Sequence, residues 1–124
     1  MYDKSLTIEI LKRVEESLRE VIAWTEHIKR ADDFAANNEG VILLNAVCMK
    51  LIAVGEEVKA IDRRTDGKLL SKYDEIPWKD VMGLRDIIAH HYFDVDAGEI
   101  FTVIRTDIPP LLKVINKMIS DLSR

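Results

Sequence analysis

The sequence predicts an all-α fold, an antiparallel bundle of four principal helices in one domain spanning residues 1–124. Apolar residues recur at steps of three and four along most of the chain, which is the period of a helix packed on one face. Proline and glycine are sparse, with 3 and 5 residues, and only 6% of residues are aromatic. A chain of 124 residues that is 48% hydrophobic can bury one core but not two. Any large pocket is therefore expected to need a second chain.

The first half of the chain predicts two long helices. Residues 5–31 place apolar side chains at helical spacing between charged ones, which predicts a long amphipathic helix. Residues 31–40 are rich in residues typical of caps and turns, so we expect a connector with one short turn. Residues 41–61 are apolar around most of the helix circumference, which predicts the central helix. Gly55 within it indicates close approach of a neighbouring helix.

A polar stretch, residues 62–75, predicts a loop. Gly67 marks a turn, and Leu69 and Leu70 are expected to pin a short turn against the core. The stretch also carries four cations, which form either a basic rim or an ordinary solvated loop. These are Arg63, Arg64, Lys68 and Lys72.

The next helix is predicted to start near Pro77, which suits a first helical turn, with Asp80 near the positive end of the helix dipole. Helical spacing predicts one inward-facing stripe on it, formed by Val81, Leu84, Ile87, Ile88 and His91. His90 falls about 180° from Val81 on the helical wheel, so it should point away from the core. Arg85 and Tyr92 lie seven residues apart and share the flank of the stripe.

The C-terminal part predicts the fourth helix. Asp94 and Asp96 are natural helix caps, and apolar spacing resumes at Ile100. Pro109-Pro110 is expected to break this helix, and an amphipathic segment follows to Leu122.

An arginine, four residues, a histidine, one residue and a tyrosine occur as Arg85-Asp86-Ile87-Ile88-Ala89-His90-His91-Tyr92. With Ile76-Pro77-Trp78-Lys79 before it, Gly83 just ahead of the arginine and Tyr92-Phe93-Asp94-Val95-Asp96 after it, this segment resembles the signature of the HEPN superfamily, specifically its HepT-like toxin branch. The resemblance spans nearly the whole chain. Asp86 stands where the family commonly has asparagine, and it adds negative charge beside the expected phosphate site.

The resemblance implies a metal-independent endoribonuclease, the toxin of a toxin–antitoxin pair, with RNA as substrate. Arg85 and His90 are the expected catalytic residues, because guanidinium pairs with phosphate and imidazole moves protons near neutral pH. Tyr92 and Asp86 are expected to orient the substrate. The implied partner is a minimal nucleotidyltransferase antitoxin that transfers AMP from ATP to Tyr92. No other cofactor is expected, and a homodimer would bring two copies of Arg85 and His90 together.

Other interpretations fit single residues equally well. Arg85 alone suits a surface ion pair with Asp86 or Glu99, and a histidine near a helix end is favoured by the helix dipole. His90 and three later residues are a conceivable metal site, although the two aspartates are expected to serve as caps. These three are His91, Asp94 and Asp96. The alternative functions are a non-catalytic helical module that binds a nucleotide or a protein and partners a nucleotidyltransferase, and a bundle that serves only in assembly.

Composition excludes several classes of protein. Cys48 is the single cysteine, so no internal disulfide can form, and its apolar neighbours predict a buried, inert thiol. No signal peptide and no membrane span are visible, so a cytoplasmic protein is expected. The net charge of −4 alone argues against a broad nucleic-acid-binding surface, and no DNA partner is expected. Residues 1–58 hold 7 basic and 11 acidic residues, whereas residues 59–124 hold 11 of each, so the arginine-bearing half repels phosphate less.

Overall fold

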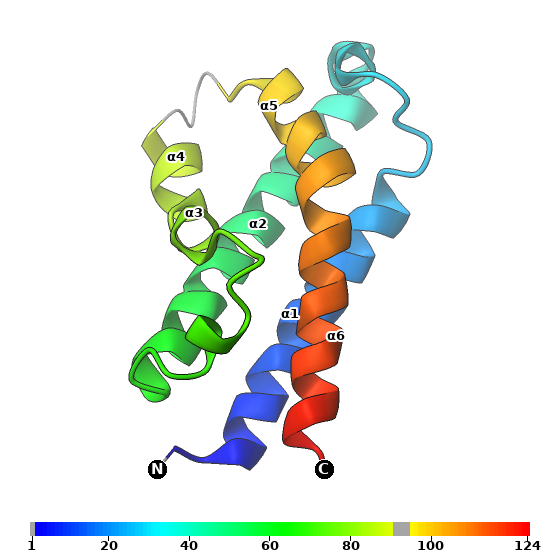
Figure 1. The fold of residues 1–124 in the computed structure, drawn as a ribbon. Coiled ribbons are helices and arrows are strands. Elements are labelled where there is room, and N and C mark those ends of the chain that lie inside the picture. Colours follow the sequence, from blue (N-terminus) through cyan, green and yellow to red (C-terminus); the bar gives the residue numbers. More distant parts are fainter. Residues whose placement is uncertain (1, 91–94) are drawn as a thin grey trace.

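The computed structural model describes residues 2–90 and 95–124, and within these ranges the chain is helical with no β-strand. Successive long segments run in opposite directions (Figure 1), which confirms the expected antiparallel all-α bundle. The elements in chain order are α1 (Lys4–Trp24), a 3-10 turn (Ala31–Ala35), α2 (Asn38–Arg64), a second 3-10 turn (Leu70–Lys72), α3 (Trp78–Met82), α4 (Leu84–His90), α5 (Ala97–Thr102), a π-helical turn (Val103–Asp107) and α6 (Ile108–Leu122).

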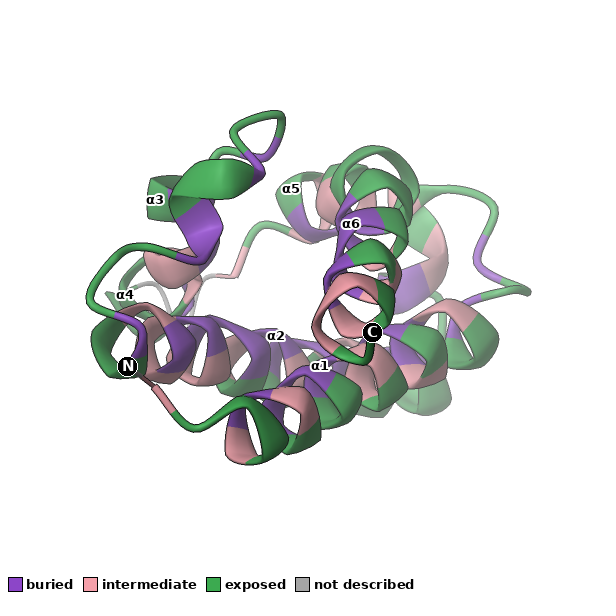
Figure 2. Cartoon of the chain, turned by 60° about the horizontal axis from the view of Figure 1, so that its bottom comes forward, coloured by how far each residue is buried: buried purple, intermediate pink, exposed green. Residues whose placement is uncertain are grey.

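The core lies where α1 packs against α2 and α6. The apolar residues of these helices recur at helical spacing, so each helix buries one face, and the buried segments of α1 and α2 turn toward α6 (Figure 2). Each fully buried aliphatic side chain contributes about 1.5–3 kcal/mol. Fully buried examples from the three helices are Leu11, Leu18, Leu51, Ile61, Ile115 and Met118.

The first two helices begin at side-chain caps. The Asp3 carboxylate accepts a hydrogen bond from the Leu6 N–H at 3.1 Å, and the Asn37 side-chain oxygen accepts one from the Gly40 N–H at 2.8 Å. The expected extent of the first helix is wrong at its end, since α1 stops at Trp24 rather than Ala31. Buried Thr25 closes it by donating from its hydroxyl to the Val21 carbonyl.

The turns between helices lie where expected, although α2 extends three residues beyond the predicted range of 41–61 at each end and shortens both connectors. The short turn in the first connector is confirmed as Ala31–Ala35. In the second connector Leu69 and Leu70 are buried, as predicted, and Gly67 has the positive φ of 72° that glycine tolerates best. The Trp78 ring nitrogen donates to the Tyr73 carbonyl at 2.8 Å, which ties the end of this loop to the start of α3.

The expected close approach at Gly55 is confirmed. A Cβ atom at this position would lie 3.0 Å from the Val81 carbonyl oxygen and 3.5 Å from the Leu84 Cβ. The helix predicted from Pro77 onward is divided at Gly83 into α3 and α4. Of the predicted inward stripe, Val81 and Ile88 are buried and Leu84 is half-buried.

Ile87 departs from the predicted stripe, because it is 47% exposed. The chain divides at Gly83 into α3 and α4, and Ile88 is the residue of α4 that is fully buried in the core. His91, the last member of the stripe, lies outside the described residues.

The C-terminal helix restarts at its prolines, as predicted. Asp96 caps α5 by accepting from the Gly98 and Glu99 N–H groups, and Asp94 lies outside the described residues. Pro109 and Pro110 occupy the first turn of α6, directly after the π-helical turn. Proline donates no hydrogen bond and crowds the preceding turn, so the regular ladder cannot continue unchanged through this point. None of the described helices is long and apolar enough to cross a lipid bilayer.

Candidate active site

Arg85 lies in the first turn of α4, on the surface of the bundle. Its side chain is 55% exposed, and its Nε atom lies 3.2 Å from the Glu56 Oε1 atom on α2. The ion pair suggested by sequence, with Asp86 or Glu99, is therefore not the one formed. Glu56 is accessible to Arg85 because Gly55, its neighbour, lets the start of α4 approach α2.

The geometry of this ion pair leaves part of the guanidinium available. Glu56 engages Arg85 through Nε, whereas two-pronged recognition of a phosphate can use the two terminal nitrogens. Ion pairs between exposed groups contribute only about 0.2–1 kcal/mol, so a phosphate can compete with Glu56. Glu56 can thus orient the arginine without blocking its phosphate-binding edge.

His90 is the last residue of α4 and is exposed, as the helical wheel predicts. It follows Arg85 by five residues, which corresponds to about 7.5 Å along the helix and about 140° around it. On a single straight helix the two side chains therefore leave from different sides. One copy of the chain offers both groups to solvent but does not wrap them around one phosphate.

The structure describes only some of the other predicted site residues. Asp86 is exposed in the first turn of α4, next to Arg85. Tyr92 lies outside the described residues, so its predicted role in orienting substrate and accepting AMP stays a prediction. The conceivable metal site also includes undescribed residues, His91 and Asp94. Among the residues that the structure describes, no group of three or more His, Cys, Asp or Glu side chains is placed to hold a metal ion.

Glu56 is the site residue that the sequence interpretation missed. In the sequence, Glu56 is only one of the few polar residues in a mostly apolar predicted helix. The available signal was Gly55, which marks the point where another segment crosses α2 and therefore where an adjacent acidic side chain can meet it.

A row of exposed apolar side chains runs along α2 toward this ion pair. Ile42 is 67% exposed and Met49 is 66% exposed, and with Glu56 they are spaced by seven residues, so all three lie on nearly the same face of the helix. Val41, at 48%, and Ile87 on α4, at 47%, are exposed as well. We call Val41, Ile42, Met49 and Ile87 the apolar surface set.

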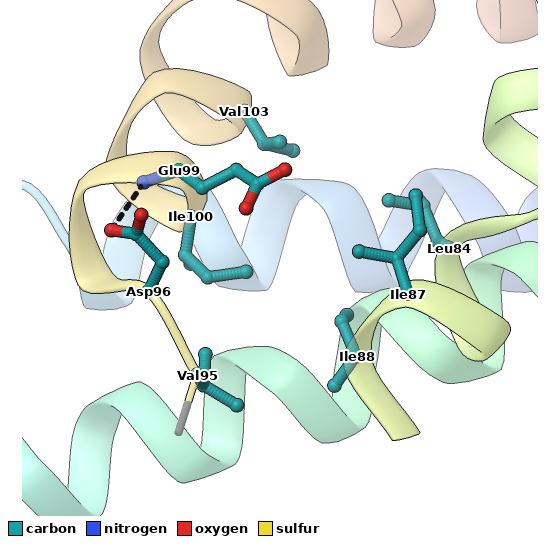
Figure 3. Close-up of a pocket in the computed structure, with 8 residues that line it drawn as sticks. All are labelled: Leu84, Ile87, Ile88, Val95, Asp96, Glu99, Ile100 and Val103. Carbon is teal, nitrogen blue, oxygen red and sulfur yellow. Dashed lines mark hydrogen bonds between the residues drawn. The ribbon is translucent and has the colours of Figure 1, made fainter. Parts of the chain in front are cut away.

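A pocket of about 320 Å³ lies beside α4, and the described residues that line it disfavour phosphate (Figure 3). Leu84, Ile87 and Ile88 line it from α4. Among the residues that the structure describes, its lining across the gap is apolar except for Asp96 and Glu99. A pocket whose only charged lining groups are carboxylates repels phosphate. The chemistry predicted for Arg85 therefore belongs to the outer flank of α4 rather than to this pocket.

Comparison with known proteins gives one family. The family model described as "Ribonuclease HepT-like" matches residues 8–118. A Thermococcus cleftensis protein named "Probable ribonuclease HepT" is 32% identical, and the match covers 77% of this chain and 84% of that protein. A Methanocaldococcus jannaschii protein named "Putative RNase" is 30% identical, with 86% and 82% covered.

A longer relative shares only part of its length with this chain. The Methanocaldococcus jannaschii protein named "Gamma-glutamylcyclotransferase and putative RNase" is 32% identical over 92% of this chain, and the chain spans 48% of that protein. No solved structure matches the chain significantly.

Proposed function

The chain belongs to the HepT-like ribonuclease family, and on that premise we propose that it is a metal-independent endoribonuclease and the toxin of a toxin–antitoxin pair. The observation that carries the proposal is the exposed pair on α4, with Arg85 in an ion pair with Glu56 and His90 exposed to solvent at the helix end. A substrate that carries a phosphate next to a hydroxyl group, whose proton a base can remove, fits these two groups. RNA is such a substrate, because its 2′-hydroxyl lies next to each phosphate.

The reaction uses the two groups in different roles. His90 takes the proton of the ribose 2′-hydroxyl, and the oxygen attacks the adjacent phosphorus. The bond from phosphorus to the 5′ oxygen of the next nucleotide breaks, and that oxygen takes up a proton. Arg85 stabilises the charge that builds on the non-bridging oxygens. Each contribution is typically worth about 10²–10⁴-fold in rate.

A homodimer completes the site in this proposal. The seven-residue spacing of Ile42, Met49 and Glu56 resembles one seam of a helix–helix contact, and a second copy packed on the apolar surface set would run along α2 toward Arg85. A two-fold contact of this kind places Arg85 of one copy near the motif of the other. That arrangement overcomes the separation of about 140° between Arg85 and His90 on one helix.

Sedimentation at micromolar concentration tests the dimer. We expect twice the monomer mass of 14.2 kDa for the wild type and a monomer for the double variant Ile42→Glu and Met49→Glu. Lys113→Glu, an exposed position on α6, is the control and should remain dimeric. A wild-type protein that sediments only at 14.2 kDa refutes the proposed dimer.

The proposed partner is a minimal nucleotidyltransferase antitoxin in the cytoplasm, which transfers AMP from ATP to Tyr92. Tyr92 follows His90 by two residues, so a phosphate-bearing adduct there would compete for Arg85 and block RNA. Intact-mass measurement after co-expression should show added AMP that is lost in Tyr92→Phe. An unmodified toxin that is nevertheless silenced in the complex would indicate steric masking and contradict the adenylylation.

RNA cleavage in the presence of a chelator tests the central proposal. Arg85→Ala and His90→Ala should each lower cleavage at least about 100-fold while the helical circular dichroism spectrum stays unchanged. Full activity in the purified double variant refutes the assigned chemistry. Binding of RNA without cleavage by the wild type would instead favour the alternative, a non-catalytic module that partners a nucleotidyltransferase. The acidic Asp86 beside Arg85 is the observation that favours this alternative.

A further inference from the structure

A hollow lined by cations lies at the end of α2, away from the motif histidine. Its lining comes from three parts of the chain, the N-terminus, the end of α2 and the loop after it, which meet at one end of the bundle (Figure 1). The volume is about 900 Å³. We call it the basic hollow, and its lining residues are Tyr2, Lys4, Arg64, Thr65, Asp66, Lys68, Ser71 and Lys72.

The charge of the basic hollow contrasts with that of the chain. It holds four cations and one carboxylate, Asp66, whereas the whole chain carries −4. All four cations are exposed, and none forms an ion pair with another residue in the ranges 2–90 and 95–124. Four cations around a single carboxylate repel one another, and a polyanion that binds there relieves this repulsion.

The backbone of the loop holds these side chains in place. The Gly67 N–H donates to the Asp62 carbonyl at 2.9 Å and the Lys68 N–H to the Thr65 carbonyl at 3.0 Å. Buried Leu69 and Leu70 anchor the following turn, which carries Lys72. The cations therefore project from an ordered turn rather than from a loose loop.

The basic hollow lies within reach of the candidate active site along one helix. Arg64 follows Glu56, the partner of Arg85, by eight residues of α2, which corresponds to about 12 Å along the helix axis. A single-stranded RNA of a few nucleotides spans such a distance. A shallow groove beside α4 has the opposite charge. The charged groups among the described residues that line it are all carboxylates, those of Asp80, Asp96, Glu99 and Asp107.

We propose that the basic hollow binds the phosphate backbone of single-stranded RNA that flanks the cleaved bond. The inference rests on the proposed ribonuclease function and adds a second contact, through which the enzyme holds an RNA chain while Arg85 and His90 act on one phosphate. Lys4, Lys68 and Lys72 contact phosphates as point charges, and Arg64 supplies the fourth cation, at the end of α2. Because such contacts do not recognise bases, they make the affinity for RNA depend on its length rather than on its sequence.

Two matched triple variants test this contact in the inactive His90→Ala background. In the hollow variant Lys4, Lys68 and Lys72 become glutamine. In the control variant three other exposed lysines do, and these are Lys12, Lys29 and Lys113. The two variants have the same net charge, so a difference between them reports position alone. Binding is measured by fluorescence anisotropy with a labelled uridine oligonucleotide of about 20 nucleotides, and again with a uridine dinucleotide, which is too short to reach from Arg85 to the hollow.

We expect the hollow variant to bind the long RNA at least about tenfold more weakly and to lower the slope of log K against log salt by about 2, since each lost contact to a single strand removes about 0.7. The control variant should differ from its parent by less than about twofold, and the short RNA should show less than twofold change in either variant. Equal weakening by both variants would show that only net charge matters and would overturn the proposal. Tight binding of anionic lipid vesicles with no hollow-dependent binding of RNA would overturn it too.

Failure of the proposed function is distinguishable from failure of this inference. The binding assay uses a variant without the catalytic histidine, so its outcome does not depend on cleavage. Cleavage by the wild-type chain is measured separately, and a wild type that binds through the hollow without cutting would refute the ribonuclease chemistry and leave the backbone contact standing.

Discussion

Replacing Gly55 by valine should separate the two helices that build the candidate active site. The Cβ atom of any side chain at this position would lie 3.0 Å from the Val81 carbonyl oxygen and 3.8 Å from the Arg85 amide nitrogen. Valine adds two further methyl groups beyond Cβ. Since the nearest neighbour is backbone, α3 and the start of α4 must move away from α2 to accommodate them.

The expected loss of stability follows from two opposing terms. Overpacking at a close contact costs about 1–3 kcal/mol. Valine is a better helix former than glycine by about 0.4 kcal/mol, which offsets part of that cost. The net destabilisation of Gly55→Val is therefore about 0.6–2.6 kcal/mol, or a fall in Tm of roughly 2–10 °C at about 4 °C per kcal/mol for a domain of this size.

Thermal and urea unfolding measure this loss, with Ala53→Val as the matched control. Ala53 lies on the same helix and is exposed, so its valine variant carries only a propensity cost of about 0.6 kcal/mol. RNA cleavage should fall by about 10–100-fold in Gly55→Val, because a displacement of Arg85 by about 1 Å has effects of this size. A Gly55→Val protein as stable and as active as Ala53→Val would refute the argument that this contact positions Arg85.

Three further results are expected. Glu56→Ala should lower kcat for RNA cleavage by about tenfold with little change in KM, whereas Glu56→Asp, which keeps a carboxylate for the ion pair with Arg85, should recover part of the loss. Equal losses in the two variants would refute a positioning role. Burial, followed by the hydrogen bond to Asp121, raises the pKa of Tyr73 to about 12, above the unfolded value near 10, so stability is complete below pH 10 and falls as the pH rises through 12. Urea unfolding should show about 1.4 kcal/mol of this loss at pH 11, absent from Tyr73→Phe. Burial raises the pKa of the Cys48 thiol, so a thiol reagent at pH 8 should modify the folded protein at least about tenfold more slowly than the urea-unfolded chain, and equal rates would contradict its burial.

Long-range helix packing was predictable wherever the apolar period was unbroken. The bundle, the close approach at Gly55 and the pinned turn at Leu69 and Leu70 all follow from side-chain pattern and glycine geometry. Helix ends were less predictable, because the end of α1 depends on the hydrogen bond from the Thr25 hydroxyl rather than on any break in hydropathy.

The candidate site was predictable in its members but not in its contacts. Spacing alone placed His90 on the outside of α4, and its exposure agrees. The partner of Arg85 was not predictable, because Glu56 is 29 positions away and the pairing depends on how α2 crosses α4. Ile87 was misplaced for a related reason, since the division at Gly83 changes which side of α4 meets the bundle.

Spacing along helix α2 fixes the relative positions of several residues discussed above. Ile42, Met49, Gly55, Glu56 and Arg64 lie on it in that order, and each residue adds a fixed rotation of about 100° and a rise of about 1.5 Å. One inserted residue between Met49 and Glu56 would turn the acid away from Arg85 while leaving hydropathy, charge and helix content almost unchanged. Inside this helix the number of residues between two functional positions therefore matters independently of which residues they are.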